Sequence, residues 1–291
     1  MKNDFENVQM TSEKKPSKIG AIFKGLLLMF IYIVVVSIPQ LFVLIPMLAR
    51  VAMNADSIDT YQQSLMNEMT RNSTLLTLST FIGTLIAVAI VVIWYYFGVY
   101  KRDVKSGTYV SVLQKLKSVK TFIFLIAGTI AAYSLAVIIL DTLYIIMPTM
   151  GTAFNTSMGA VVGGIPVVGL LLTLVLAPIG EEICIRGIFL NRAEKSFGMI
   201  GCIILSGLFF GMYHMNPVQG LYAIPIGMFL GYVAYKFKSV IPCIFCHFVN
   251  NLMASLGSLH HFGEYIILPI ICFIVLGIVV VYLAKKEYTF T

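Results

Sequence analysis

Charged residues are scarce in this sequence. Only 11% of its 291 residues are Asp, Glu, Lys or Arg, whereas about 25% of a typical soluble domain is charged. Hydrophobic residues make up 59% of the chain and are gathered in long runs. The shortage of charge argues against a soluble globular protein, and the long runs predict a protein that crosses a membrane several times.

Segments of about ten residues in which hydrophobic and polar residues alternate, the pattern of a transmembrane barrel, are also missing from the sequence. The hydrophobic runs are long enough for helices, because a bilayer core about 30 Å thick takes about 20 helical residues per crossing. The predicted fold is therefore all-α, an integral membrane bundle of about eight transmembrane helices. The predicted spans lie near 24–46, 74–98, 121–147, 165–190, 199–214, 219–235, 240–256 and 265–284.

The domain organisation predicted from the sequence is simple, because no repeat, low-complexity tract or separate soluble domain is found. Residues 1–20 are predicted to form a basic cytosolic tail, and residues 21–291 a membrane domain. The first hydrophobic run is long and lacks a small-residue cleavage site, so we expect an anchor helix and not a cleaved signal peptide. We expect the polar stretch 50–73 to form an external loop.

Positive charge is distributed unevenly between the two sides of the predicted spans. Of the 20 Lys and Arg residues, only Arg50 and Arg71 fall in external loops, and Arg186 falls inside a span. Because basic loops stay in the cytosol, we predict a multi-pass protein of the cell membrane with both termini cytosolic. This topology accounts for the net charge of +7, which therefore does not indicate nucleic-acid binding.

Polar side chains interrupt the predicted spans in three short motifs. The motifs are E-E-x-x-x-R at Glu181, Glu182 and Arg186, F-x-x-x-H at Phe210 and His214, and H-x-x-x-N at His247 and Asn251. An Asp or Arg at the centre of a spanning helix raises the free energy of insertion by roughly 2.5 to 3.5 kcal/mol, so the buried charges need a functional reason. At about 1.5 Å per residue, the motifs are predicted to share the middle layer of the membrane.

Spacing within the first motif separates the two carboxylates. Glu182 and Arg186 are four residues apart, so we predict an ion pair on one helix face. Glu181 is rotated about 100° from Glu182 around the helix and is left to face another helix. Each polar residue on its own could be a bridge between helices, but their common depth favours one shared site.

In this order on successive spans, the motifs resemble those of the CPBP family of intramembrane proteases. This family includes CAAX prenyl endopeptidases and the Abi proteins linked with bacteriocin maturation and immunity. The match covers roughly Val161 to Leu256, and we expect the protease core at about 121–285. The resemblance implies an intramembrane endopeptidase with a catalytic cavity between helices, which cleaves a membrane-associated peptide or protein of CAAX or bacteriocin-precursor type.

The resemblance also implies a role for each motif residue. Glu181 would be the general base that takes a proton from water, and His214 would hold the same water. His247 and Asn251 would donate hydrogen bonds to the oxyanion of the tetrahedral intermediate. Glu182 and Arg186 would be a supporting pair, with Phe210 as a further supporting residue.

Metal dependence is left open by the sequence. Glu181, His214 and His247 could supply three zinc ligands with a fourth position for water. The sequence has no H-E-x-x-H motif, and a Glu/His water site works without a metal, so we favour a metal-free site. Cys243, Cys246 and His247 match the haem-attachment pattern C-x-x-C-H, which we interpret as coincidence, and we expect no disulfides.

Two non-enzymatic interpretations are kept beside the protease. The protein could be an inactive immunity or signalling-scaffold protein, or a transporter subunit in which Asp141 belongs to an ion pathway. No inverted repeat supports the transporter. Gly227 and Gly231 form a small-xxx-small face for helix packing or a homodimer. The expected partners are the lipid bilayer and the substrate, whose prenylation the sequence does not determine.

Overall fold

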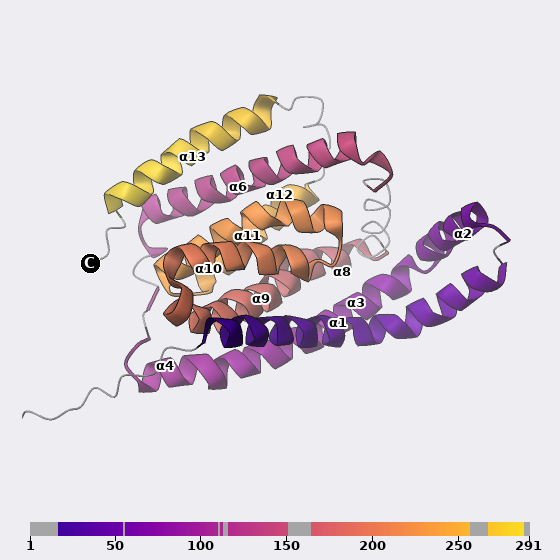
Figure 1. Cartoon of the computed structure of the whole chain (residues 1–291), viewed down its shortest axis with the longest axis horizontal. Coiled ribbons are helices and arrows are strands. Elements are labelled where there is room, and N and C mark those ends of the chain that lie inside the picture. The colour runs from indigo at the N-terminus through magenta and orange to yellow at the C-terminus, as the bar shows by residue number, and fades with distance from the viewer. Residues whose placement is uncertain are drawn as a thin grey trace, which may run out of the picture.

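The computed structural model describes residues 17–54, 56–109, 111–112, 116–150, 164–256 and 267–287. Within these ranges every regular element is a helix, which confirms the predicted all-α fold (Figure 1). The elements, with η marking a π-helix, are α1 (Lys18–Asn54), α2 (Ile58–Arg71), α3 (Ser73–Tyr95), η1 (Tyr96–Tyr100), α4 (Lys101–Lys105), α6 (Val119–Ile146), α8 (Pro166–Leu171), η2 (Leu172–Leu176), α9 (Ala177–Glu182), η3 (Ile183–Leu190), α10 (Asn191–Tyr213), α11 (Pro217–Phe237), α12 (Ile241–Ser255) and α13 (Ile267–Glu287).

By length and composition, six helical stretches among the described residues can cross a membrane, so the protein is a multi-pass membrane protein. One of them, Pro166–Tyr213, has 48 residues and contains two predicted spans. It is kinked at Gly198, whose φ of 64° is not helical. The helix α12 has only 15 residues, too few at about 1.5 Å per residue to cross a 30 Å core alone. Each of the predicted spans nevertheless contains a helix.

The polar stretch 50–73, predicted as an external loop, is largely helical, so the prediction of a loop is wrong, whereas its external position stays a prediction. The helix α1 continues to Asn54, and α2 follows after a short bend. A capping box starts α2, because the Ser57 hydroxyl accepts from the Thr60 amide and the Thr60 hydroxyl accepts from the Ser57 amide. Arg50 on α1 pairs with Glu68 on α2 at 3.1 Å, which links the two helices.

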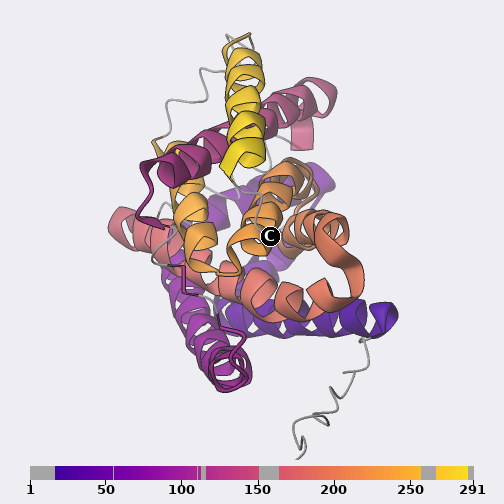
Figure 2. The same ribbon diagram turned by 90° about the vertical axis from the view of Figure 1, so that its left-hand side faces the viewer.

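The helices α10 and α11 pack along each other, and the outer face of α10 is exposed (Figure 1). The helix α6 packs against α11 and carries α13 on its outer side, whereas α1 and α3 pack together on the opposite side of the molecule (Figure 2). The short α12 contacts α6, α9, η2 and α11, so it lies inside the bundle. This position places the residues of α12 beside the carboxylates of α9.

Small residues allow α10 and α11 to pack closely. A Cβ on Gly227 would lie 2.9 Å from the Gly207 Cα, and a Cβ on Gly231 would overlap the Ser206 side chain. The face formed by Gly227 and Gly231 therefore packs against α10 of the same chain. Of the two roles predicted for this face, helix packing and homodimer formation, the structure shows helix packing. A homodimer would need a different surface.

The N-terminal part of the first helix packs against the bundle along one narrow stripe. The stripe consists of Ala21, Gly25, Leu28 and Tyr32, which share one helix face because they are three or four residues apart. Gly25 lies against the rings of Phe189 and Phe209, which stack with their centroids 4.3 Å apart. Many hydrophobic side chains elsewhere on α1 are exposed, as expected for a helix that faces lipid.

Candidate active site

Glu182 and Arg186 form the buried ion pair that the sequence predicts. The Arg186 Nη1 donates to Glu182 Oε1 at 2.8 Å, and both side chains are 0% exposed. The Arg186 Nε donates to Ser206 Oγ and Nη2 donates to the Gly227 carbonyl, each at 3.0 Å. Ser206 also donates to that carbonyl at 2.6 Å. Such bonds from two other helices offset part of the desolvation of the guanidinium.

The helix that carries both carboxylates is bordered by π-helices. Glu181 and Glu182 are the last two residues of α9. The π-helix η2 lies directly before α9, and the π-helix η3, which contains Arg186, lies directly after it. A π turn has i→i+5 hydrogen bonds, so it changes the direction in which the following side chains point, and such turns are frequent at functional sites. The regular 3.6-residue period assumed in the sequence analysis therefore holds within α9 but not through its neighbours.

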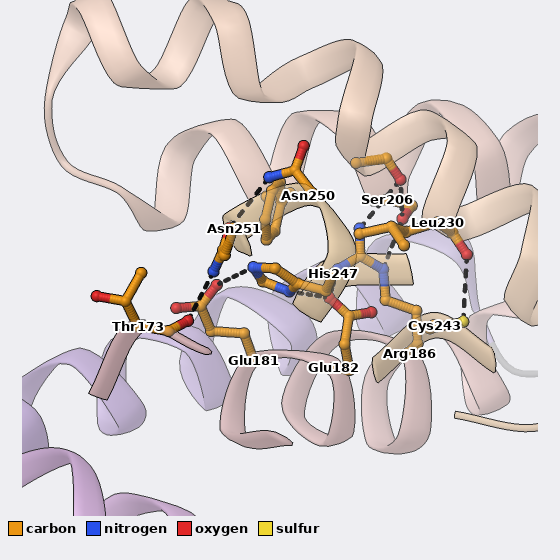
Figure 3. Close-up of polar contacts among 12 residues, drawn as sticks. Thr173, Glu181, Glu182, Arg186, Ser206, Leu230, Cys243, His247, Asn250 and Asn251 are labelled. Atoms are coloured by element: carbon orange, nitrogen blue, oxygen red, sulfur yellow. Dashed lines mark hydrogen bonds and ion pairs between the residues drawn. The ribbon is translucent and has the colours of Figure 1, made fainter. Parts of the chain in front are cut away.

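His247 of α12 connects the two carboxylates (Figure 3). Its Nδ1 lies 2.8 Å from Glu182 Oε1, the same oxygen that accepts from Arg186. Because a carboxylate only accepts, Nδ1 carries a hydrogen and donates it. The other ring nitrogen, Nε2, lies 3.9 Å from Glu181 Oε2. The sequence assigned Glu182 to Arg186 alone, so the contact between Glu182 and His247 was missed.

Phe210 lies between the two histidines. Its ring meets His214 and His247 edge to face, at centroid distances of 4.9 and 5.3 Å, and the Arg186 Cζ lies 4.8 Å from its centroid. The His214 Nδ1 is 2.7 Å from the Phe210 carbonyl, which can only accept. His214 Nε2 is therefore the nitrogen that can bind another group. The structure thus gathers both residues of the F-x-x-x-H motif beside His247.

Asn251 is anchored to the backbone of η2. Its Nδ2 donates to the Thr173 carbonyl at 2.9 Å, and its Oδ1 accepts from Asn250 Nδ2 at 3.0 Å (Figure 3). These two bonds determine which end of the amide carries the donors. An amide nitrogen has two hydrogens, and only one is used by Thr173. Donation of the second to a substrate oxyanion stays a prediction.

Several contributors to the site were not predicted. Most of them lack a sequence signal because they act through a backbone carbonyl or lie on another helix. The residues are Thr173, Ser206, Gly227 and Asn250. Asn250 alone had a visible hint, since it stands directly before Asn251 in the third motif.

Two acceptor atoms of the site are buried without a hydrogen bond. Glu181 Oε2 and Glu182 Oε2 have no hydrogen-bond partner among the residues that the structure describes. Glu181 as a whole is 6% exposed. Buried acceptors are normally satisfied, and the exceptions are often groups that take part in chemistry. Glu181 is the better candidate for a base, because Arg186 and His247 already occupy the other oxygen of Glu182.

The three candidate zinc ligands are not gathered as a metal site. Within the described ranges, no three His, Cys, Asp or Glu side chains are grouped so that they could hold a metal ion. The Nδ1 atoms of His247 and His214 are bonded to Glu182 and to the Phe210 carbonyl, so only the Nε2 atoms could serve as ligands. As the side chains stand, Glu181, His214 and His247 do not form a three-ligand zinc site.

The C-x-x-C-H pattern is buried in the bundle. The thiols of Cys243 and Cys246 face the carbonyls of Leu230 and Leu125, at 3.5 and 3.8 Å. Both cysteines are fully buried, and all five cysteines are free, as the sequence predicts. They pack as small hydrophobic side chains.

The helices that carry the site match a known family. Residues 163–253 match the family model described as type II CAAX prenyl endopeptidase Rce1-like. This segment resembles that family. It contains all three polar motifs, and the resemblance to CPBP-type intramembrane proteases predicted from the sequence is confirmed. No curated protein and no solved structure matches the chain. The Rce1-like match supports protease activity in general, and the substrate and the roles of single residues are matters for proposal.

Proposed function

We propose that this protein is an intramembrane endopeptidase that hydrolyses a peptide bond in a membrane-associated peptide or protein. The observation that carries the proposal is the position of His247, which lies against Glu182 at 2.8 Å and faces Glu181 at 3.9 Å. The group is buried within a segment that matches a protease family. Ionisable residues inside membrane helices are unfavourable unless they are paired or functional, and Glu181 is the less paired of the two carboxylates.

In the proposed reaction, the Glu181 carboxylate accepts a proton from a water molecule that His214 Nε2 helps to hold. The water oxygen attacks the carbonyl carbon of the scissile bond and forms a tetrahedral oxyanion. When the intermediate collapses, the carbon–nitrogen bond breaks and protonated Glu181 returns its proton to the leaving amine. All bonds and protons in this sequence are accounted for by Glu181, water and substrate.

His247 and Asn251 are proposed to stabilise the oxyanion. The Nδ1 hydrogen of His247 is used by Glu182, so His247 can donate to the oxyanion only through a hydrogen on Nε2. A ring that donates from both nitrogens is positively charged, and its charge would lie directly against the Glu182 carboxylate. This gives Glu182 a reason to be in the site beyond its pairing with Arg186. The second hydrogen of Asn251 Nδ2 would be the other donor.

For the substrate, we propose a CAAX-type peptide, whose C-terminal region carries a prenylated cysteine. The description of the matched family supports this class. A bacteriocin or other peptide precursor would use the same hydrolytic chemistry and is the alternative substrate. The complete set of polar motif residues favours an active enzyme over an inactive scaffold, since nothing in such a scaffold would require Glu181 to be buried with an unpaired oxygen.

The proposal can be tested with purified full-length protein in proteoliposomes. The probes are a fluorogenic farnesylated peptide with a C-terminal Cys-a-a-X sequence and the same peptide without the farnesyl group. We expect the wild type to cleave the farnesylated peptide faster, and Glu181→Ala to cleave neither. Equal cleavage of both peptides would contradict the CAAX class. No cleavage of either, together with unchanged membrane peptides in cells with and without the protein, would contradict the protease itself.

A further inference from the structure

Tyr32 of α1 lies beside the proposed base, although α1 is outside the segment that matches the Rce1-like family. Tyr32 is the last member of the buried stripe on α1 and is 2% exposed. A Cβ added to Gly180 would overlap the Tyr32 hydroxyl and would lie 2.9 Å from the Val88 Cγ2. Only a glycine at this position lets the hydroxyl approach the backbone directly before Glu181.

The polar atoms around Tyr32 form a small buried group. The Tyr32 hydroxyl and Glu181 Oε2 are both buried, and neither has a hydrogen-bond partner among the described residues. Tyr32, Tyr213 and the Glu181 carboxylate influence one another electrostatically. The rings of Tyr32 and Tyr213 are 5.6 Å apart and inclined by 56°. Two phenol donors therefore border a carboxylate that accepts.

We infer that Tyr32 is a positioning residue of the proposed active site, which, together with Tyr213, presents hydroxyl donors to the Glu181 carboxylate. The inference rests on the proposed function as far as proton transfer is concerned, whereas the approach of the Tyr32 hydroxyl to Gly180 is independent of it. A buried tyrosine hydroxyl normally has a partner, and a carboxylate is the strongest acceptor nearby. Tyr32 keeps its own proton throughout and acts only by orienting Glu181. The first helix thus completes a site whose motif residues all lie elsewhere.

A purely structural role for Tyr32 makes a different prediction. If Tyr32 only fills space between α1 and α9, phenylalanine would serve as well, since Tyr32→Phe keeps the ring. The hydroxyl is the only group removed, so any change at Glu181 must come from it. Tyr133→Phe is the matched control, because Tyr133 is a partly buried tyrosine on α6.

An infrared measurement tests the contact without any need for activity. The carboxyl band of Glu181 is identified in proteoliposomes as the band that is lost in Glu181→Gln. We expect Tyr32→Phe to shift this band and Tyr133→Phe to leave it in place. An identical band in Tyr32→Phe and the wild type would overturn the inference.

A kinetic measurement with the farnesylated peptide tests the role. We expect Tyr32→Phe to lower kcat about 10-fold with KM nearly unchanged, less than the 10² to 10³ lost with a direct oxyanion donor. If Glu181→Ala is inactive but Tyr32→Phe keeps the wild-type kcat, the inference fails and the proposed function stands, even if the band shifts. If Glu181→Ala retains full activity, the proposed function fails, and the positioning role fails with it, while the infrared result still reports the contact.

Discussion

The imidazole of His247 lies between two carboxylates that are adjacent in the sequence. Its Nδ1 is 2.8 Å from Glu182 Oε1, and its Nε2 is 3.9 Å from Glu181 Oε2. Glu182 also accepts from Arg186, whereas Glu181 Oε2 has no hydrogen-bond partner among the described residues. The two glutamates therefore have different surroundings, and different roles follow from them. Glu182 holds the imidazole and the guanidinium, and Glu181 is left for chemistry.

Replacement of Glu182 by glutamine should destabilise the protein strongly. The change leaves Arg186 buried without its counter-charge, and removal of one partner of a buried pair lowers the free energy of unfolding by about 3 to 5 kcal/mol. Chemical unfolding in detergent would measure it. The control is Glu194→Gln, which breaks the partly exposed pair with Lys238 and should lower the free energy by less than about 1 kcal/mol. Equal effects of the two variants would contradict the structural role of Glu182.

Replacement of Glu181 by glutamine should abolish cleavage while the protein stays folded and inserted. Glutamine keeps the size and the hydrogen-bonding capacity of the side chain but cannot take a proton from water. His214→Ala should have a similar effect, and the double variant should be scarcely worse than either single one, because both residues act on one water. Initial rates with the farnesylated peptide would measure this. Full activity of Glu181→Gln would remove Glu181 from the mechanism.

Loss of the Asn251 amide should lower kcat more than loss of its neighbour. Asn251→Ala removes a proposed oxyanion donor, an effect of about 10² to 10³ in other proteases. Asn250→Ala removes only the group that donates to Asn251 Oδ1, while the bond to the Thr173 carbonyl remains. We therefore expect the smaller loss for Asn250→Ala. A kcat that is the same in Asn251→Ala and the wild type would show that the amide does not contact the oxyanion.

Zinc should not be required for cleavage. Among the described residues, Glu181, His214 and His247 are not grouped as a set of metal ligands, and a Glu/His water site works without a metal. We expect the purified protein to contain well under one equivalent of zinc by mass spectrometry and to cleave the peptide in the presence of a chelator. A stoichiometric zinc content that disappears in both His247→Gln and His214→Ala would prove this expectation wrong.

The orientation predicted from the charge distribution can be tested with epitope insertions. A tag after Asp56, in the bend between α1 and α2, should be accessible to antibody in intact cells. A tag after Thr108, in the turn that follows α4, should be accessible only after permeabilisation. The reverse result would mean that both termini face outward.

Local features of the site follow from the sequence. The class of the protein and the approximate positions of its helices could be predicted because long hydrophobic runs have few other solutions in a membrane. The pair formed by Glu182 and Arg186 could be predicted because residues four apart share a helix face. The polar stretch 50–73 was predicted as a loop because it is too polar to span a membrane, but a polar segment outside the bilayer can still be helical, and the capping box at Ser57 starts α2.

The tertiary structure decided which of these side chains meet. Glu182 and His247 are 65 residues apart, and no periodicity within one helix connects them. The same holds for Arg186 and the Gly227 carbonyl, and for Tyr32 and Gly180, where the close approach depends on a missing side chain. The sequence by itself therefore determined a set of polar residues on the helices of a membrane bundle. Packing between helices determined the partners of these residues, because the rotation and crossing of helices are set by contacts between residues distant in sequence. The π-helices η2 and η3 also change the helical period on which a sequence-based prediction depends.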